Sequence, residues 1–557
     1  MEEKISIYCK NNKQQQEFNA GVSLLEIYQG MEIQLPYQLA CAKVNNVTES
    51  LSFQCYKPKD VEFIGLDNPA GMRTYVRSLC FVLSKAAHDL FPEGKLYIEH
   101  ALSKGYFCEI EIGRELTAED VARLKQRMQE IIAAGYPLIT CEDQSPKVIE
   151  LFRNSGMEDK AILLETIKEV YSKYNMLDGY VDYFYGCLLP NTQWLYLFDI
   201  EKYGNGLLLR VPNRDKPTEL EPYVNQAKMM TVFQELLKFQ KAMDMNNVGE
   251  LNQHIQAGEI STVVQISETL QERQIGRIAD EIHRLYNEQG VRVVLIAGPS
   301  SSGKTTFCRR LQIQLMATTL HPVGISLDDY YVNRVDTPLD EYGEYDYESL
   351  YAIDLKKFDE DLQKIIAGEK VDLPTYDFQT GERVYSGNSV QLRPRSVLVM
   401  EGIHAMNPDL LPNIPHETTY KIYVSALTSI SLDNHNWIPT TDNRLIRRIV
   451  RDYRFRGYSA KETISRWPSV RRGEDKWIFP YQENANAMFN SAMLYELAAL
   501  REIVEPILKE VTQIDDEYSE AHRLLKFMRY FNYVSKEELP NTSLLREFVG
   551  GSSFHFS

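Results

Sequence analysis

Short apolar stretches alternate with polar ones along the first sixty residues. KISIYC (4–9) alternates like a half-buried strand, and ACAKVN (40–45) and LSFQCY (51–56) are further candidate strands. Between them, Ser23 and Glu26 form a capping-box pattern ahead of an apolar helical turn. This order of strands and helix predicts a β-grasp domain over residues 1–62.

The stretch that follows combines helical and strand periodicity. Apolar residues recur at helical spacing over 75–90 and 116–134, and the alternating segment 95–112 predicts a hairpin. Residues 63–215 are therefore predicted to form an α+β domain. Residues 216–289 are polar with apolar positions at i, i+3 and i+4, which predicts a helical connector.

Continuous apolar runs replace alternation in the following segment. Val293–Ala297, 321–327, 396–400 and 420–426 each form a short run, and helical patterns separate them. This spacing predicts a parallel, doubly wound α/β sheet over residues 290–510, with ligands at the carboxyl ends of its strands. Residues 511–557 begin as a helix and continue as a tail, for which the pattern predicts no role.

Composition narrows the classes of partner. The net charge of −17 over 557 residues disfavours non-specific nucleic-acid or membrane binding. No run of about eighteen apolar residues occurs, and the N-terminal residues lack the apolar region of a secretory signal. The eight cysteines include no C-x-x-C pair, so we expect free thiols in a cytoplasmic protein. The oligomeric state stays open, a homo-oligomer included.

The run at Val293 leads into G-P-S-S-S-G-K-T-T and then a helical pattern, which together form the P-loop arrangement. Glycines let the backbone approach phosphate oxygens closely, and the helix N-terminus adds partial positive charge. The lysine can reach the terminal phosphates, and the first threonine can bind Mg²⁺. The residues predicted to bind a nucleoside triphosphate are Gly298, Pro299, Ser300, Ser301, Ser302, Gly303, Lys304, Thr305 and Thr306.

Other motifs separate the classes of P-loop protein. The N-K-x-D motif of GTPases is missing, and the strand at 396–400 ends in Glu401–Gly402 rather than in Asp–Glu. Four stretches in order, ISLDDYY (325–331), LPTYDF (373–378), VMEGIHA (399–405) and RLIRRIVRDYRFRG (444–457), resemble the uridine kinase and phosphoribulokinase family. The resemblance implies transfer of the ATP γ-phosphate to the 5′-hydroxyl of a nucleoside, with Mg²⁺ as cofactor.

The resemblance also implies roles for individual residues. Asp328 would be the catalytic base and, with Thr305 and Glu401, a magnesium ligand. From 444 to 476 the chain has eleven Lys and Arg against four Asp and Glu, an unusual balance in an acidic protein. Lys304, Arg448 and Arg451 would stabilise the transferred phosphate, and Arg456 would bind ATP, with Arg471 and Arg472 as weaker candidates. The alternatives are a helix cap for Asp328 and Asp329, a solvated loop acid for Glu401, and a solvated face for the arginines.

On the acceptor side, the residues implied to bind substrate are Tyr331, Tyr347, Glu348, Tyr376 and Phe378. The histidine with which the family reads the base falls on Gly381, which leaves the nucleoside open and predicts a pocket with room for a purine. The alternative acceptor is a sugar phosphate, although the pair Tyr376 and Phe378 favours a flat base.

The first 200 residues carry a second resemblance. VNNVTESLSF (44–53), the stretch 86–112 and LTAEDVARLKQRMQEI (116–131) resemble the N-terminal part of threonyl-tRNA synthetases. In that family two residue pairs bind a metal in the editing domain; here their positions fall on Arg77, Phe81, Phe184 and Leu188. The resemblance therefore implies the fold without the editing reaction. A tRNA-binding module that uses the P-loop as an ATPase switch remains an alternative function.

Overall fold

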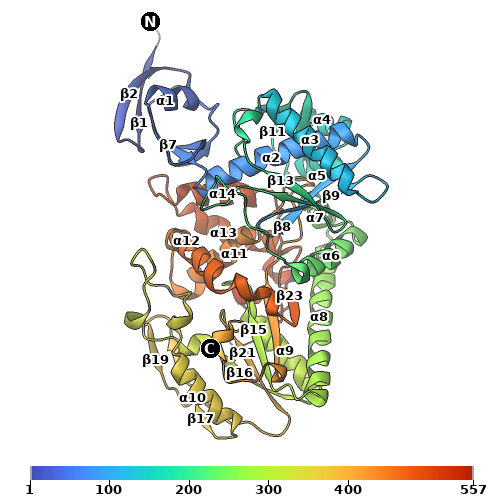
Figure 1. Ribbon diagram of the computed structural model, residues 1–557, viewed down its shortest axis with the longest axis vertical. Helices are drawn as coiled ribbons and strands as arrows, with labels where there is room; N and C mark the ends of the chain where they lie inside the picture. The colour runs from blue at the N-terminus through green and yellow to red at the C-terminus, as the bar shows by residue number, and fades with distance from the viewer. Residues whose placement is uncertain (1–2, 555–557) are drawn as a thin grey trace.

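The structure, a computed structural model, describes residues 3–554; the ends of the predicted first and last segments, 1–2 and 555–557, lie outside the described residues. Figure 1 shows a small N-terminal domain and an α/β part at one end, and a larger α/β part at the other. Within residues 3–554, no helix is both long and apolar enough to cross a membrane. The eight cysteines are free thiols.

The N-terminal domain is a five-stranded sheet, in the order β2-β1-β7-β4-β5, with one helix packed on it. The Ser23 capping box is present, since the Glu26 amide donates to Ser23 Oγ and the Ser23 amide donates to Glu26 Oε2. The predicted strand over 51–56 is shorter, because only Gln54–Cys55 pairs, with β3. The elements are β1 (Lys4–Cys9), β2 (Gln14–Asn19), β3 (Val22–Ser23), α1 (Leu24–Gly30), β4 (Leu39–Val44), β5 (Val47–Glu49), β6 (Gln54–Cys55) and β7 (Lys59–Gly65).

The second part contains the predicted hairpin, which lies in a four-stranded sheet ordered β13-β14-β9-β8. Helix α2 begins six residues earlier than its apolar pattern predicts, because Asn68 caps it ahead of a proline. The elements are α2 (Pro69–Leu90), β8 (Lys95–Leu102), β9 (Gly105–Glu111), α3 (Ala118–Ala134), β10 (Ile139–Gln144), α4 (Ser145–Asn154), α5 (Glu158–Ile167), β11 (Tyr171–Leu177), β12 (Tyr180–Asp182), β13 (Asp199–Tyr203) and β14 (Gly206–Arg210).

Three helices connect the two halves: α6 (Ala227–Ala242), α7 (Val248–Gln256) and α8 (Ile260–Glu288). The longest, α8, runs along the large α/β part and packs on α9 (Figure 1). Its buried residues Ile275 and Ile282 share a core with Phe307 and Leu311 of α9. The connector is therefore packed into the core of the large α/β part.

The large α/β part is built on a parallel sheet ordered β16-β21-β15-β22-β23. Strand β15 is buried on both faces: Val294 and Ile296 belong to one core, and Val293, Leu295 and Ala297 to another. The predicted doubly wound parallel sheet is thus confirmed. The strands are β15 (Val293–Ala297), β16 (His321–Ser326), β17 (Val371–Asp372), β18 (Thr375–Asp377), β19 (Glu382–Val384), β20 (Ser389–Val390), β21 (Ser396–Glu401), β22 (Thr419–Ser425) and β23 (Ala487–Asn490).

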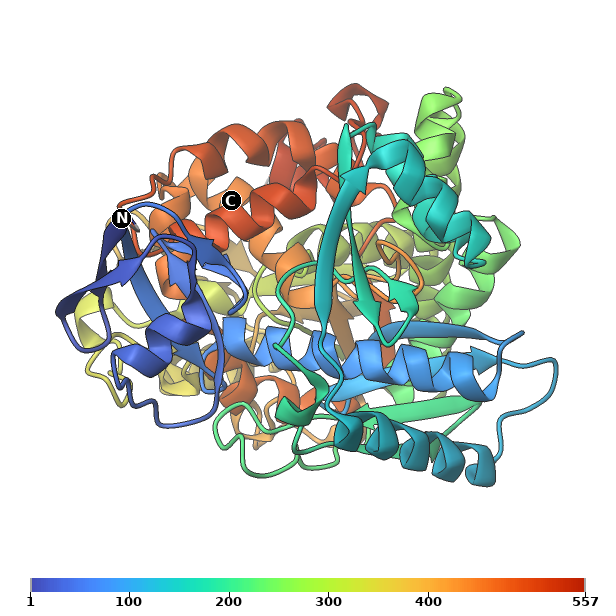
Figure 2. The same cartoon turned by 90° about the horizontal axis from the view of Figure 1, so that it is seen from above.

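The helices of this part cover both faces of the sheet and end in a C-terminal group that packs beside the N-terminal half (Figures 1 and 2). They are α9 (Lys304–Ala317), α10 (Leu355–Ile366), α11 (Thr440–Arg451), α12 (Ala460–Trp477), α13 (Glu496–Lys509), α14 (Tyr518–Met528) and α15 (Arg546–Val549), with a π-helical turn at Asp452–Arg456.

The loop between β22 and α11 inserts into the second part of the chain. The carbonyl oxygen of Asn434 accepts from the Ile98 amide of β8 at 2.8 Å, and the Lys160 ammonium lies 2.7 Å from the Asp433 carboxylate. His435 Nδ1 lies 2.8 Å from Asp182 Oδ2. Because this loop leads into the arginine-bearing helix α11, the N-terminal half fixes the start of that helix.

Candidate active site

The loop between β15 and α9 has the backbone that its glycines predict. A Cβ on Gly298 would lie 2.0 Å from the carbonyl oxygen of Val424, so strand β22 excludes any side chain there. Gly303 caps α9 with a φ of 81°, in the left-handed region that favours glycine. The chain thus turns directly into a helix N-terminus, whose first amides have no partner within the helix.

Lys304 and Thr305 begin α9 and connect it to the neighbouring strand ends. Lys304 Nζ donates a hydrogen bond of 3.2 Å to the carbonyl oxygen of Pro299, so this side chain folds back over the loop. Thr305 Oγ1 donates a hydrogen bond of 3.2 Å to Glu401 Oε1, at the end of β21. The predicted ligands Thr305 and Glu401 are therefore direct neighbours.

The two aspartates after β16 have different surroundings. Asp329 Oδ1 accepts a hydrogen bond of 3.2 Å from the Tyr376 amide, and burial raises the pKa of its carboxyl to about 6. Asp328 follows β16, whose last residue, Ser326, pairs with Glu401 of β21. Burial and, after it, the charge of Asp328 raise the pKa of Glu401 to about 7. Asp328 thus lies near the phosphate loop, whereas Asp329 holds the strand that carries Tyr376.

The oxygen atoms at this edge of the sheet fit a magnesium ion. The Thr305 hydroxyl and the carboxylates of Glu401 and Asp328 are hard donors, and Mg²⁺ usually takes one or two carboxylates, substrate phosphates and water. A divalent cation would also offset the cost of burying Glu401 beside a second carboxylate. No group of three or more His, Cys, Asp or Glu side chains within residues 3–554 is arranged as a metal cage, so the substrate phosphates would supply further ligands.

The three predicted arginines contact the site in different ways. Arg448 Nη1 donates a hydrogen bond of 2.8 Å to Ser300 Oγ in the loop. The Arg456 guanidinium lies 4.9 Å from the ring centroid of Phe378, on the acceptor side. Arg451 is paired with Asp452 at 2.8 Å, beside it in the chain. The charge of Arg451 is the main cause that lowers the pKa of Arg456, to about 10.

Two other arginines of α11 are buried and anchor the loop. Arg444, 1% exposed, donates 3.0 Å to the Ser300 carbonyl oxygen and pairs with Glu474 of α12. Arg447, fully buried, pairs with Glu496 of α13. Glu474 also accepts from the Ser300 amide at 3.2 Å. Neither glutamate could be found from the sequence, because Glu474 is one acid in a basic stretch and Glu496 lies in an ordinary helical pattern.

The weaker candidates Arg471 and Arg472 lie on α12, and both pair with acids. Arg471 Nη1 donates 2.8 Å to Glu474 Oε2, and Arg472 Nη2 donates 3.3 Å to Asp340 Oδ2. Arg471 therefore supports the buried pair of Arg444, and Arg472 joins α12 to the loop that precedes the acceptor residues.

The predicted acceptor residues form an aromatic cluster. The ring centroids of Tyr331 and Tyr376 are 5.6 Å apart and those of Tyr376 and Phe378 are 5.1 Å apart, both edge to face. Tyr347 is 40% exposed and lies nearest to Tyr345, at 5.9 Å. The structure thus brings Tyr331, Tyr376 and Phe378 together and leaves Tyr347 at the margin. Such rings offer flat apolar faces to a ligand.

Glu348 lies beneath the helix α12. A Cβ on Gly473 would lie 2.3 Å from Glu348 Cβ, so the two backbones approach closely. Burial raises the pKa of the Glu348 carboxyl to about 7, and the charge of Arg448 acts in the opposite direction. A carboxyl group therefore lies between α12 and Arg448.

The space at Gly381 is filled, which corrects the expectation of a pocket with extra room. A Cβ there would lie 2.8 Å from Arg334 Nε, and Arg334 Nη2 donates a hydrogen bond of 2.7 Å to the Phe378 carbonyl oxygen. Burial raises the pKa of Tyr347 and of Tyr376, and the Arg334 charge acts in the opposite direction. An arginine side chain thus covers Gly381. No local motif marks Arg334, because it reaches this position from a loop 47 residues away.

Residues 293–497 match the family model described as Phosphoribulokinase / Uridine kinase family. This segment is a P-loop kinase domain. The match spans the phosphate loop, both aspartates, Glu401 and the arginine helix. Similarity to this family indicates a phosphotransferase domain.

Solved structures similar to the kinase domain include a possible uridine kinase from Bacillus stearothermophilus, at 20% identity and a TM-score of 0.24, covering 36% of this chain and 89% of that chain. A D-glycerate 3-kinase from Cryptococcus neoformans is also similar, at 16% identity and a TM-score of 0.21, covering 46% of this chain and 87% of that one. Scores this low say nothing about the acceptor.

The region ahead of the kinase domain is similar to threonine–tRNA ligases. The ligase from Syntrophomonas wolfei is 29% identical over 190 residues, which are 34% of this chain and 30% of the ligase. The one from Xanthomonas euvesicatoria is 27% identical over 188 residues, 33% of this chain and 30% of the ligase. The chain therefore covers less than a third of these relatives' length.

The four positions that correspond to the metal ligands of the editing domain form packing contacts. The rings of Phe81 and Phe184 lie 5.3 Å apart, and Leu188 is buried. Arg77 packs against Gly186 and donates 3.4 Å to the Cys187 carbonyl oxygen. Two of the positions are thus an aromatic pair, and a third is an arginine, which does not bind metals.

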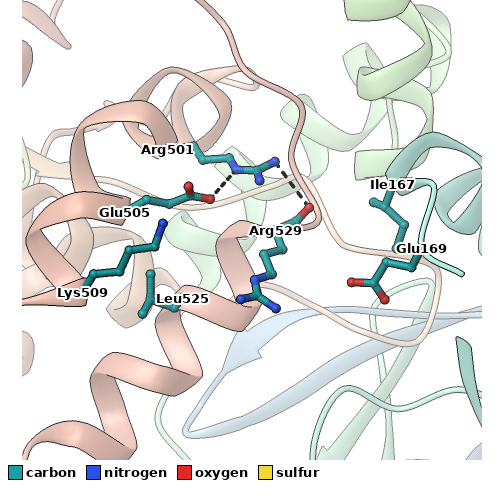
Figure 3. Close-up of a pocket in the computed structure, with 7 residues that line it drawn as sticks. All are labelled: Ile167, Glu169, Arg501, Glu505, Lys509, Leu525 and Arg529. Carbon is teal, nitrogen blue, oxygen red and sulfur yellow. Dashed lines mark hydrogen bonds and ion pairs between the residues drawn. The ribbon is translucent and has the colours of Figure 1, made fainter. Parts of the chain in front are cut away.

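A cavity of about 230 Å³ lies apart from the phosphate loop, between α13, α14 and the segment after α5 (Figure 3). Arg501 spans it and donates to Glu505 at 2.7 Å and to backbone carbonyl oxygens of Arg529 and Phe531. The Arg501 guanidinium is therefore already hydrogen-bonded within the protein. The cavity lies between the N-terminal and C-terminal halves of the chain. It is lined by Ile167, Glu169, Arg501, Glu505, Lys509, Leu525 and Arg529.

Proposed function

We propose that the kinase transfers the γ-phosphate of ATP to the 5′-hydroxyl of a nucleoside. The observation that carries the proposal is the position of Asp328. Asp328 follows β16, whose Ser326 pairs with Glu401 beside the phosphate loop, and its backbone carbonyl oxygen accepts at 3.3 Å from the amide of Tyr331 in the aromatic cluster. A group that removes the proton of an acceptor hydroxyl has to lie between these two sites.

In the proposed reaction, the amides from Ser301 to Thr306 and the Lys304 ammonium bind the ATP phosphates. Asp328 accepts the proton of the attacking hydroxyl, and Arg448, which already contacts Ser300, stabilises the negative charge of the transferred group. Arg456 and Arg451 follow it in the chain and add positive charge. Mg²⁺, held by Thr305, Glu401 and Asp328, would neutralise phosphate charge when bound.

The base of the acceptor is proposed to lie among the rings of Tyr331, Tyr376 and Phe378. The ribose hydroxyls would then donate hydrogen bonds to the Glu348 carboxylate. Arg334 adds N–H donors at the edge of this cluster, which suit a base with carbonyl oxygens. The same guanidinium favours a second candidate, a sugar phosphate, because arginine binds phosphate in a bidentate manner. The three rings favour the nucleoside.

The test measures ADP release from Mg·ATP with a panel of nucleosides and sugar phosphates. Nucleoside-dependent release supports the proposal, release with sugar phosphates alone supports the second candidate, and release with neither contradicts both. In Asp328→Asn we expect kcat to fall at least about 100-fold with unchanged ATP affinity. The matched control is Asp329→Asn, for which a higher acceptor KM is expected, because Asp329 holds the Tyr376 amide. Unchanged turnover of Asp328→Asn would remove the assigned base.

We also propose the division predicted from the sequence: 1–62, 63–215, a connector over 216–289, a kinase domain over 290–510 and a C-terminal segment over 511–557. The insertion of residues 433–435 into the second part supports a structural role for the N-terminal half. The substrates of the proposed kinase would be ATP and a small acceptor molecule.

A further inference from the structure

The C-terminal segment returns to the phosphate loop. Leu544, Leu545 and Phe548 are fully buried and share a core with Ile296 of β15 and Phe307 of α9. The segment is therefore anchored by apolar packing at the base of the nucleotide site.

Two contacts bring this segment onto the loop itself. A Cβ on Gly303 would lie 2.4 Å from Leu544 Cδ2, so a leucine side chain covers the glycine that caps α9. The ring of Phe548 lies 5.0 Å from the guanidinium of Arg447, whose Nη1 donates to the Ser301 carbonyl oxygen at 3.4 Å. The residues at both ends of the short helix α15 thus contact either the phosphate loop or Arg447, which is bonded to that loop.

Glu547, on α15, occupies a position that a phosphate would use. Its Oε2 accepts a hydrogen bond of 3.1 Å from the Thr306 amide and one of 2.8 Å from Thr306 Oγ1. Thr306 is the third residue of α9, so its amide is one of the helix N-terminal donors that a P-loop offers to phosphates. Thr306 is fully buried, and the carboxylate takes both of its donors.

A carboxylate and a phosphate cannot both accept this amide proton at full strength. They carry like charges, and at hydrogen-bond distance their repulsion in a partly buried site is large. When the phosphates bind, the Glu547 side chain has to leave the Thr306 amide.

We propose that Glu547 is an internal competitor of the nucleotide, so that the C-terminal segment lowers the affinity of the resting chain for ATP and ADP. The inference rests on the proposed nucleotide site and adds a residue that sets its affinity. Because Leu544 and Phe548 anchor the segment in the core, release needs only the carboxylate to rotate away.

The test is a titration of the full chain with ADP, followed by calorimetry, for the wild type, Glu547→Ala and Glu547→Gln. The alanine variant should bind ADP about tenfold more tightly, because the lost hydrogen bonds involved a charged group. The glutamine variant, which keeps an acceptor and loses the charge, should lie between the two. Glu538→Gln is the matched control, since it removes one exposed negative charge from the same segment, and its affinity should equal that of the wild type.

Equal or weaker ADP binding by both Glu547 variants, with binding by the wild type intact, would overturn this inference and leave the proposed kinase untouched. Loss of folding in the near-isosteric Glu547→Gln would also overturn it, because Glu547 would then be a structural cap of α9. If no form of the chain binds ADP or ATP, the proposed function fails together with the inference.

Discussion

Thr305 Oγ1 donates a hydrogen bond of 3.2 Å to Glu401 Oε1, which joins the first turn of α9 to the end of β21. The two residues are 96 positions apart, and parallel pairing of β15 with β21 brings them together. This pairing aligns the hydroxyl and carboxylate donors of the proposed magnesium site.

Replacing Thr305 with alanine removes one of these oxygen donors. We expect the Mg²⁺ concentration for half-maximal activity to rise about tenfold, because Mg²⁺ depends on a small number of well-placed oxygen ligands. A magnesium titration at saturating ATP measures this. The control is Thr318→Ala at the other end of α9, where the hydroxyl bonds only the Leu315 carbonyl oxygen. An unchanged magnesium requirement in Thr305→Ala would exclude Thr305 as a ligand.

Glu348 predicts a pH dependence of acceptor binding. Burial raises the pKa of its carboxyl to about 7, so the group is neutral below this pH and charged above it. A charged carboxylate accepts hydroxyl hydrogen bonds more strongly than a neutral one. The KM for the acceptor should therefore fall to about a fifth of its value as pH rises from 6 to 8. Steady-state kinetics across this range give the profile. Glu348→Gln should show a flat profile with a high KM, and a profile as steep as that of the wild type would assign the titration to another group.

The contact between Gly473 and Glu348 predicts a selective defect. In Gly473→Ala the new methyl group would meet Glu348 Cβ at 2.3 Å, so the glutamate or helix α12 has to move. We expect the acceptor KM to rise about tenfold with little change in the KM for ATP, because overpacking displaces neighbouring side chains. Gly276→Ala in α8 is the control, since its Cβ would only reach Gln314 at 3.8 Å. A parallel rise in both KM values would indicate general disruption of the domain.

The sequence predicted the phosphate loop and the parallel sheet because their signals are local. Glycines at 298 and 303 and the apolar run at Val293 reflect backbone approach and burial within a few residues. Asp328 was placed by the same logic, since it follows the strand β16 by two residues. Helix α2 was placed too late because its first turn is fixed by the cap at Asn68 rather than by apolar spacing.

Residues that complete the site through distant contacts had no such signal. Glu474 reaches Arg444 across 30 positions, and Glu547 reaches Thr306 across 241. Each is an ordinary acid in its local sequence, and only the packing of α12 and α15 against the loop gives it a partner. Burial also separates Arg444 and Arg447 from Arg448, which a count of positive charges along the segment does not reveal.

Arg447 and Glu496 form a fully buried ion pair that predicts a large effect on stability. Glu496 Oε2 accepts from Arg447 Nη2 at 2.6 Å, and the same arginine donates to the Ser491 carbonyl oxygen at 2.9 Å. In Glu496→Gln the arginine remains buried without its counter-ion, which costs about 3–5 kcal/mol. Thermal unfolding followed by circular dichroism should show a markedly lower midpoint for the kinase transition. In Glu281→Gln, which breaks an exposed pair with Arg284, the cost should stay below about 1 kcal/mol. Equal midpoints for the two variants would mean that water reaches Arg447. The conclusion that this ion pair holds Ser301 rigidly would then be wrong.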